Sequence, residues 1–143
     1  MGQQQLLLII LGVIIVGIAI AVGLQLFQAG AVDSNQDAMI TDIMNISANA
    51  DQWRIRPVSM GGGGGTFNAD IVAKLNENER LTETANAIYV VTFNADNQIT
   101  IVGTSNAGYG TVQLVYTYDG VDDAARYVWS GDHDGGIGGT AAV

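Results

Sequence analysis

Hydrophobic residues form one unbroken run near the start of the chain. From Leu6 to Leu24, nineteen consecutive residues are Leu, Ile, Val, Ala or Gly. A helix of that length spans about 28 Å, which is enough to cross a bilayer. The run is apolar on every face, so a soluble domain would have to enclose it completely, and the rest of the chain is too small for that. The pattern predicts a helix surrounded by lipid or by copies of itself.

The helical period continues beyond this run, but only along one stripe. Positions at steps of three and four, which is heptad spacing, are apolar there except for Gln36, namely Ala29, Val32, Gln36, Met39, Ile43, Ile46, Ala50 and Trp53. Pro57 stops the helix, because proline lacks the N–H that a helix interior needs. We therefore expect one helix from about residue 3 to about 55, loosened at Gly23 and Gly30.

The period changes to two after Ala87. Four segments rich in Val, Ile, Thr, Tyr and Trp predict strands at 87–94, 98–104, 111–118 and 125–130. The Asp96-Asn97 turn and the short links predict an antiparallel meander. One face of this sheet is expected to pack on the striped half of the helix, through Ile99, Ile101, Leu114 and Tyr116.

The segment between helix and sheet contains turn signals. Five consecutive glycines, Gly61–Gly65, predict a loop, and Asn68 or Asp70 is expected to cap a short helix through Leu75. The predicted fold is α+β: a long N-terminal helix on a four-stranded, mainly antiparallel sheet. Its three parts are an apolar helix at 1–32, an amphipathic continuation at 33–57, and a sheet-bearing head with a glycine-rich tail at 58–143.

Composition narrows the class of protein. The chain has 143 residues, no cysteine, and fourteen acidic against five basic residues, none of them before Asp33. That length allows one modest domain, and the missing thiols exclude disulfides and cysteine nucleophiles. A net charge of -9 repels phosphate backbones, so nucleic acid is not an expected partner of the isolated subunit.

Candidate chemistry is sparse. His133 lies between Asp132 and Asp134 in a glycine-rich tail that we expect to be loose, and a second acidic loop follows the third strand. Oxygen-rich loops suit calcium. Five carboxylates are therefore either weak candidates for calcium ligands or solvated side chains in turns, namely Asp119, Asp122, Asp123, Asp132 and Asp134. The glycine run lacks the spacing and lysine of a phosphate loop. We expect no catalytic site and no cofactor.

Two further patterns remain. Asn45-Ile46-Ser47 matches the acceptor pattern for N-glycosylation, although it falls on the predicted helix. Within the apolar run, the pairs Gly17/Ala21 and Ala19/Gly23 are spaced four apart, as in helices that approach closely. A cleaved signal peptide is disfavoured, because the run is long and no basic residue precedes it. A simple single-pass anchor remains open.

With these features the N-terminal segment, roughly residues 1–57, resembles the type IV pilin family, including pseudopilins and archaeal pilins. The run from Leu6 to Ile15 falls where that family has its aliphatic membrane and filament-core helix. The resemblance implies a structural subunit, not an enzyme, which polymerises into an extracellular pilus-like filament. It assigns assembly to Met1, Gln5, Leu6, Ile10, Ile14, Gly17, Ala21 and Gly23.

The resemblance also implies partners and shows departures. Before assembly the subunit would lie in the cytoplasmic membrane, where a leader peptidase and the pilus assembly machinery act on it. The mature chain would begin at Met1 or, if Gly2 is the cleavage glycine, at Gln3; Met1 is favoured because a two-residue leader lacks basic residues. Gln5 stands where bacterial members usually carry glutamate, so an amide must replace that charge.

Two other functions stay open at this stage. The chain is alternatively a pseudopilin of a secretion machine, or a monomeric, membrane-anchored extracellular module that binds a small ligand or calcium. Adhesion, motility and DNA uptake are not distinguished by the sequence, nor is a bacterial from an archaeal origin.

Overall fold

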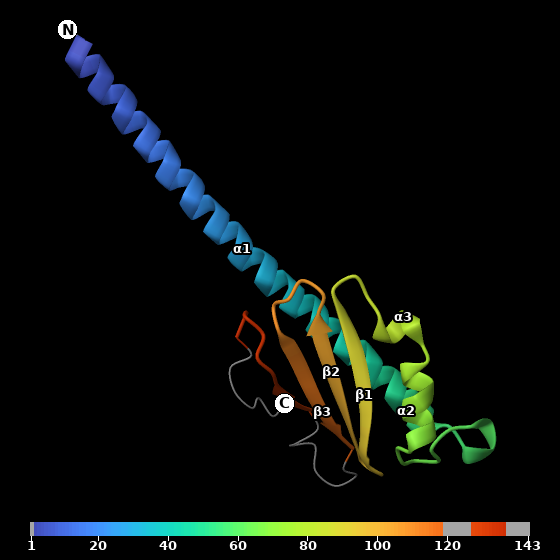
Figure 1. The fold of residues 1–143 in the computed structure, drawn as a ribbon. Helices are drawn as coiled ribbons and strands as arrows, with labels where there is room; N and C mark the ends of the chain where they lie inside the picture. The colour runs from blue at the N-terminus through green and yellow to red at the C-terminus, as the bar shows by residue number, and fades with distance from the viewer. Residues whose placement is uncertain (1, 119–126, 137–143) are drawn as a thin grey trace. The chain divides into compact units, whose positions relative to one another are not determined.

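A computed structural model describes residues 2–118 and 127–136. The chain divides into two compact units, Met1–Ser34 and Asn35–Val143. One helix, α1 (Gly2–Ile55), supplies the described part of the first unit and continues into the second, where a four-stranded sheet lies against it (Figure 1). The fold is α+β, as predicted.

Helix α1 begins and ends close to the predicted positions. Its last helical residue is Ile55, two residues before Pro57. The helix is continuous through Gly23 and Gly30, so the loosening expected at these glycines is not seen. Helical hydrogen bonds inside so long an element outweigh the cost of about 1 kcal/mol that each glycine adds relative to alanine.

The sheet is the predicted antiparallel meander. Its strands are β1 (Ala87–Ala95), β2 (Gln98–Ser105), β3 (Thr111–Thr117) and β4 (Tyr127–Ser130), in the order β1-β2-β3-β4. Every neighbouring pair is antiparallel, and the register of β1 on β2 shifts between Phe93 and Ala95. Short connections join the first three strands, which is why they are neighbours in space as well as in sequence.

The core of the second unit lies between the sheet and the later part of α1. Fully buried helix residues meet fully buried strand residues there, namely Met39, Ile43, Ile46, Ala50, Ile99, Ile101, Leu114 and Tyr116. This confirms the predicted inner face of the sheet. The buried stripe departs from strict heptad spacing at its end, where Arg54 is buried and Trp53 is only half-buried. An α-helix has 3.6 residues per turn, so a 3.5-residue repeat drifts around a straight helix.

Three short helical elements connect α1 to the sheet. They are the 3₁₀ helix η1 (Val58–Met60), α2 (Ala69–Asn76) and α3 (Glu79–Thr82). The side chain of Asn68, not of Asp70, caps α2 by accepting the N–H of Ile71 at 2.8 Å. Asn76 at the end of α2 bonds both backbone groups of Val91, at 2.8 and 2.9 Å. Those bonds occupy part of the outer edge of β1, where another strand would otherwise pair.

The glycine run closes the C-terminal end of α1. Backbone N–H groups of Gly63, Gly64 and Gly65 donate to carbonyl oxygens at the end of the helix, those of Trp53, Arg56 and Arg54 respectively, at 3.1, 2.9 and 2.8 Å. The last carbonyls of a helix have no partner within it, so this loop satisfies groups that would otherwise depend on solvent. The sequence predicted the loop but not this role.

Glycine is required within that loop for steric reasons. A Cβ atom at Gly63 would collide with the carbonyl oxygen of Thr66, which is backbone and cannot rotate away. We expect Gly63→Ala to lower the free energy of unfolding by about 2 kcal/mol, because the loop must shift and give up helix-capping bonds. Urea unfolding of the full chain in detergent micelles measures this. Gly12→Ala is the control, since a Cβ there meets nothing within 4 Å.

Candidate functional site

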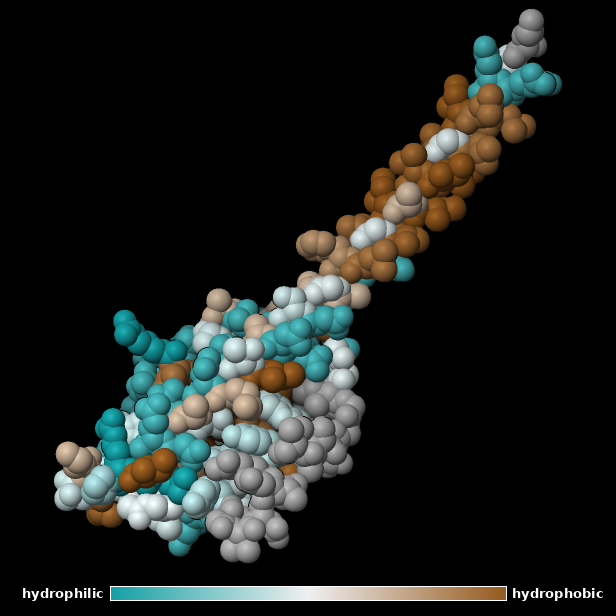
Figure 2. Space-filling model, turned by 180° about the vertical axis from the view of Figure 1, so that it is seen from behind, coloured by the Kyte–Doolittle hydropathy of each residue, from teal (hydrophilic) through white to brown (hydrophobic). Residues whose placement is uncertain are grey.

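The first unit presents an apolar surface on all sides of α1. Every large hydrophobic side chain from Leu6 to Phe27 is between 49% and 76% exposed in the single chain. Figure 2 shows these hydrophobic residues covering the visible side of the helix. The helix is long and apolar enough to cross a membrane. Exposed aliphatic surface costs about 25 cal/mol per Å² in water, so cover by lipid or protein would stabilise this segment.

The residues assigned to assembly fall on two sides of that helix. Leu6, Ile10, Ile14, Gly17 and Ala21 recur at steps of three and four, so they share one face. Gln5 and Gly23 lie on the opposite side at about 100° per residue, in line with Gly12, Ala19 and Gly30. All of these residues are exposed in the single chain. Met1 lies outside the described residues.

Glycines on this helix have no packing role within the chain. A Cβ atom at Gly12, Gly17, Gly23 or Gly30 would meet no atom within 4 Å. Each of these glycines nevertheless lowers helix stability by about 1 kcal/mol relative to alanine. What they provide is a low surface on two opposite sides of the helix, where another helix backbone can approach closely.

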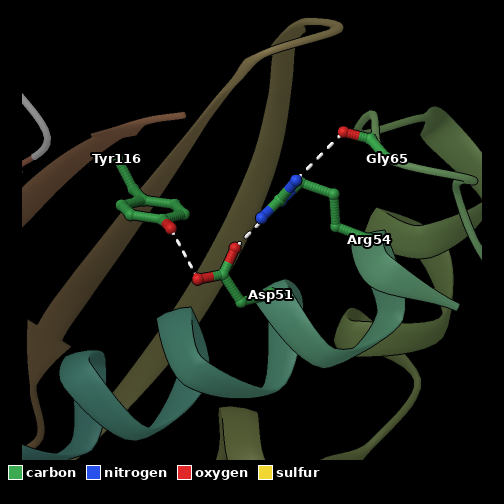
Figure 3. Close-up of polar contacts among 4 residues, drawn as sticks. All are labelled: Asp51, Arg54, Gly65 and Tyr116. Atoms are coloured by element: carbon green, nitrogen blue, oxygen red, sulfur yellow. Dashed lines mark hydrogen bonds and ion pairs between the residues drawn. The ribbon is translucent and has the colours of Figure 1, made fainter. Parts of the chain in front are cut away.

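Two carboxylates on α1 fix the second unit by binding tyrosines of the sheet. The Tyr116 hydroxyl donates to Asp51 Oδ2 at 2.7 Å, and Arg54 Nε pairs with Asp51 Oδ1 at 3.0 Å (Figure 3). Arg54 is 6% exposed, donates from Nη1 to the Gly65 carbonyl at 3.0 Å, and lies 3.4 Å from the centre of the Tyr118 ring. This cluster ties the helix, the glycine loop and the sheet together.

A second carboxylate, nine residues earlier on the same helix, does the same for β1. Tyr89 donates to Asp42 Oδ2 at 2.9 Å, and the Thr84 hydroxyl donates to the same oxygen at 3.0 Å. Burial, followed by the bond to the Asp42 carboxylate, raises the pKa of Tyr89 well above its usual value. The phenol therefore stays protonated and remains a donor. Neither Asp42 nor Asp51 belongs to the apolar stripe of the sequence, and the sequence did not predict these partners.

His133 is a structural side chain in the described part of the tail. It is 4% exposed, its Nδ1 accepts the N–H of Gly135 at 3.1 Å, and its Nε2 lies 3.2 Å from Asn35 Oδ1. Because Nδ1 accepts, the proton is on Nε2, which donates to Asn35. Asn35 Oδ1 also accepts from Ser105 at 2.9 Å. The expectation of a loose tail is wrong for residues 131–136, since His133 in this segment is buried and bonded to Asn35 on α1.

The two calcium candidates within the described residues, Asp132 and Asp134, do not form a metal site. Within residues 2–118 and 127–136, no group of three or more His, Asp or Glu side chains is placed to hold a metal ion. Asp132 Oδ1 instead accepts from the Thr111 N–H at 3.1 Å and from the Thr111 hydroxyl at 2.6 Å. The N–H of Asp134 bonds the Tyr109 carbonyl at 2.7 Å. Asp119, Asp122 and Asp123 lie outside the described residues.

The contact between Asp132 and Thr111 predicts a dependence on pH. Bonds from the Thr111 hydroxyl and then from its N–H lower the pKa of Asp132. The stabilisation from the ionised carboxylate is complete above the ordinary pKa of about 3.9 and disappears as pH falls through the lowered value. NMR titration should show the Asp132 pKa rising toward its ordinary value in Thr111→Val. An unchanged pKa in that variant would contradict the assignment.

The candidate glycosylation site is on an ordered part of α1. Asn45 is exposed, but Ile46 is fully buried and Ser47 is 3% exposed, with its hydroxyl donating to the Met44 carbonyl at 2.8 Å. The acceptor pattern is thus locked in helical backbone, and its serine is not available in the folded chain.

Comparison with known proteins gave no relative. No protein-family model, no curated protein and no solved structure matches the chain.

Proposed function

We propose that this chain is the structural subunit of an extracellular filament and polymerises through the apolar part of α1, as the resemblance to type IV pilins implies. The observation that supports this most strongly is the apolar helix surface, exposed on every side between Leu6 and Phe27. Lipid would cover it in a membrane, and identical helices would cover it after extraction. A candidate membrane-spanning helix is compatible with such an inserted precursor.

The glycines support an open assembly rather than a simple anchor. A helix that only anchors a protein in lipid needs no glycine-lined face for close helix packing, and a helix that forms a dimer needs one such face. Here Gly17 lies on one side of the helix and Gly12, Gly23 and Gly30 on the other, all without contacts in their own chain. A subunit that contacts neighbours through two different surfaces generates a ring or a continuing helical array. We therefore favour a polymer with a core of packed α1 helices.

The second unit supports the same proposal because its part of α1 already has a partner within the chain. It has its own core, in which Met39, Ile43, Ile46 and Ala50 on one face of α1 are already buried. The apolar stripe of this part of the helix is thus buried within the chain, whereas residues 2–30 are exposed throughout. Folding within the chain and contact with other copies are divided along one helix.

Electron microscopy of material sheared from the native cells tests the proposal. Long uniform fibres in which mass spectrometry finds this chain as the major component are the expected result. Detergent-stable monomers confined to membranes would overturn the proposal in favour of the anchored module. A minor component of short, transient fibres would favour the pseudopilin. We propose no enzymatic activity for the chain.

A further inference from the structure

An exposed apolar cluster lies at the end of α1 that belongs to the second unit. Ile55, Val58 and Met60 are 67%, 72% and 72% exposed, more than any other large hydrophobic side chain in the described part of residues 35–143. We call these three residues the apolar knob. Single exposed hydrophobic residues are common on protein surfaces, but here three of them lie within six residues of sequence, at the end of α1 and in the turn that follows it.

The backbone beneath the knob is held by hydrogen bonds. Met60 donates to the Pro57 carbonyl at 2.9 Å, Gly61 to Val58 at 2.9 Å, and Gly62 to Pro57 at 3.2 Å. The glycine loop that follows is fastened to the helix end by the three capping bonds described above. The side chains of the knob are therefore displayed on an ordered turn, which lowers the entropy cost of docking them.

Positive charge surrounds the knob in an otherwise acidic unit. Residues 35–143 hold thirteen acidic and five basic residues. Arg56 and Lys74 both lie against the Trp53 ring, at 4.4 and 4.9 Å from its centre, and both are exposed. Lys74 also donates to the Gly61 carbonyl at 2.8 Å, which places its charge at the base of the knob. The surface that complements the knob is thus apolar at its centre and acidic at its rim.

The same unit offers acidic groups at the other end of its helical segment. Asp37, Asp132 and Asp134 are exposed there, where His133 bonds Asn35. An anionic membrane is a poorer fit, because two exposed basic side chains are fewer than the four to eight that typify lipid-binding clusters, and the unit as a whole is acidic. A second copy of the chain supplies carboxylates for Arg56 and Lys74, and it does not present the extended negative surface of an anionic membrane, which would repel the acidic unit.

We propose that the apolar knob, with Arg56 and Lys74, docks on an acidic surface of a second copy of this chain. The contact joins unlike surfaces, so it can repeat from copy to copy. It rests on the proposed function in that neighbouring copies must be present, and it adds a contact between second units to the packing of apolar helices.

Zero-length cross-linking tests this contact directly. Lys74 is the only lysine in the chain, so a carbodiimide that joins amines to carboxylates can link only Lys74 or the N-terminal amine. Full-length chain is prepared as an equal mixture of ¹⁴N and ¹⁵N material, as fibres and in concentrated detergent solution. Peptides that join Lys74 to an Asp or Glu of the other isotope are expected. Lys74→Arg, which keeps the charge and removes the amine, should abolish them.

Substitution in the knob provides the second arm. Val58→Ser/Met60→Ser should lower the yield of Lys74 links by about tenfold, the effect of about 1.4 kcal/mol of lost contact. Met44→Ser is the matched control, because Met44 is also an exposed methionine, 40% exposed, but lies on α1 away from the knob. Equal yields in the double variant and in the wild type would overturn the proposal.

The outcomes separate this proposal from the proposed function. Fibres without Lys74 links would overturn the knob contact and leave the filament function standing. Links in detergent without fibres in any preparation would support the contact while the filament function fails. The variant Trp129→Phe keeps Trp53 as the single tryptophan and is reconstituted in liposomes that contain brominated lipid. Quenching of the Trp53 fluorescence by that lipid, without Lys74 links, would overturn the contact in favour of a lipid surface.

Discussion

Cells carrying Gly17→Arg should make no filaments. In the wild type a Cβ at position 17 would meet nothing in its own chain, so the substitution leaves intramolecular packing unchanged. An arginine at the middle of an apolar helix costs about 2.5 to 3.5 kcal/mol in a membrane, and more where identical helices exclude lipid and repeat the charge in every copy. Electron microscopy of sheared surface material measures the effect.

Loss of filaments must be distinguished from loss of the subunit. Gly17→Leu keeps the segment apolar and insertable but fills the low surface, and it should also block assembly; Gly17→Ala should permit it. Immunoblots of the membrane fraction check that each variant is present and inserted. Normal fibres from Gly17→Arg, at wild-type abundance, would count decisively against assembly through the helix core.

Arg54→Ala should produce the largest loss of stability among single changes in the second unit. The substitution leaves the carboxylate of Asp51, half-buried at 27% side-chain exposure, without its cation, and frees the Gly65 carbonyl. Removing one partner from a buried ion pair costs about 3 to 5 kcal/mol. Because Arg54 also lies against the Tyr118 ring, lost packing adds to the lost charge. Urea unfolding of the full chain in detergent micelles gives the difference.

Arg56→Ala is the matched control for that measurement. Arg56 is two residues away on the same chain segment, exposed, and in contact with the Trp53 ring. We expect a change within about 0.5 kcal/mol, as for most exposed positions. Tyr116→Phe should lie between the two, since it removes one hydrogen bond to a charged group, worth about 1.5 to 3 kcal/mol. Equal effects of Arg54→Ala and Arg56→Ala would show that the buried cluster does not stabilise the unit.

The elements of this fold were predictable because their hydrophobic periods are long and unbroken. The apolar run and the stripe from Met39 to Ala50 specify α1, and alternation specifies β1 to β3 with their buried residues. Helix α3 was not predicted, because it has only four residues, Glu79–Thr82, and so short a segment shows no hydrophobic periodicity. Short elements are fixed by tertiary contacts rather than by local sequence.

The polar contacts were not predictable, for a different reason. Asp42 and Asp51 look like solvent-facing residues at the border of an apolar stripe, and their partners Tyr89 and Tyr116 are 47 and 65 residues away. Such pairs depend on the register between helix and sheet, which no local pattern encodes. A usable signal did exist: tyrosine at inward positions of a strand needs a partner for its hydroxyl, and a helix border is where one is available.

His133 illustrates the opposite error. Flanking aspartates and glycines gave its segment the composition of a flexible acidic loop, yet the ring is buried and both nitrogens are engaged. Composition describes what a segment does alone, and Asn35 lies 98 residues earlier. The assembly residues on α1 stay predictions, because their expected partners are other copies of the chain.

The continuity of α1 from Gly2 to Ile55 has a mechanical consequence. The apolar run and the core residues Met39 and Ile43 belong to the same helix, so tension applied to the apolar run would reach these residues through helix backbone. Such tension would act first on the element that supplies Met39, Ile43, Ile46 and Ala50 to the core of the second unit. The two tyrosine–aspartate contacts, Tyr89 with Asp42 and Tyr116 with Asp51, would then resist sliding of the helix along the sheet at two separate positions.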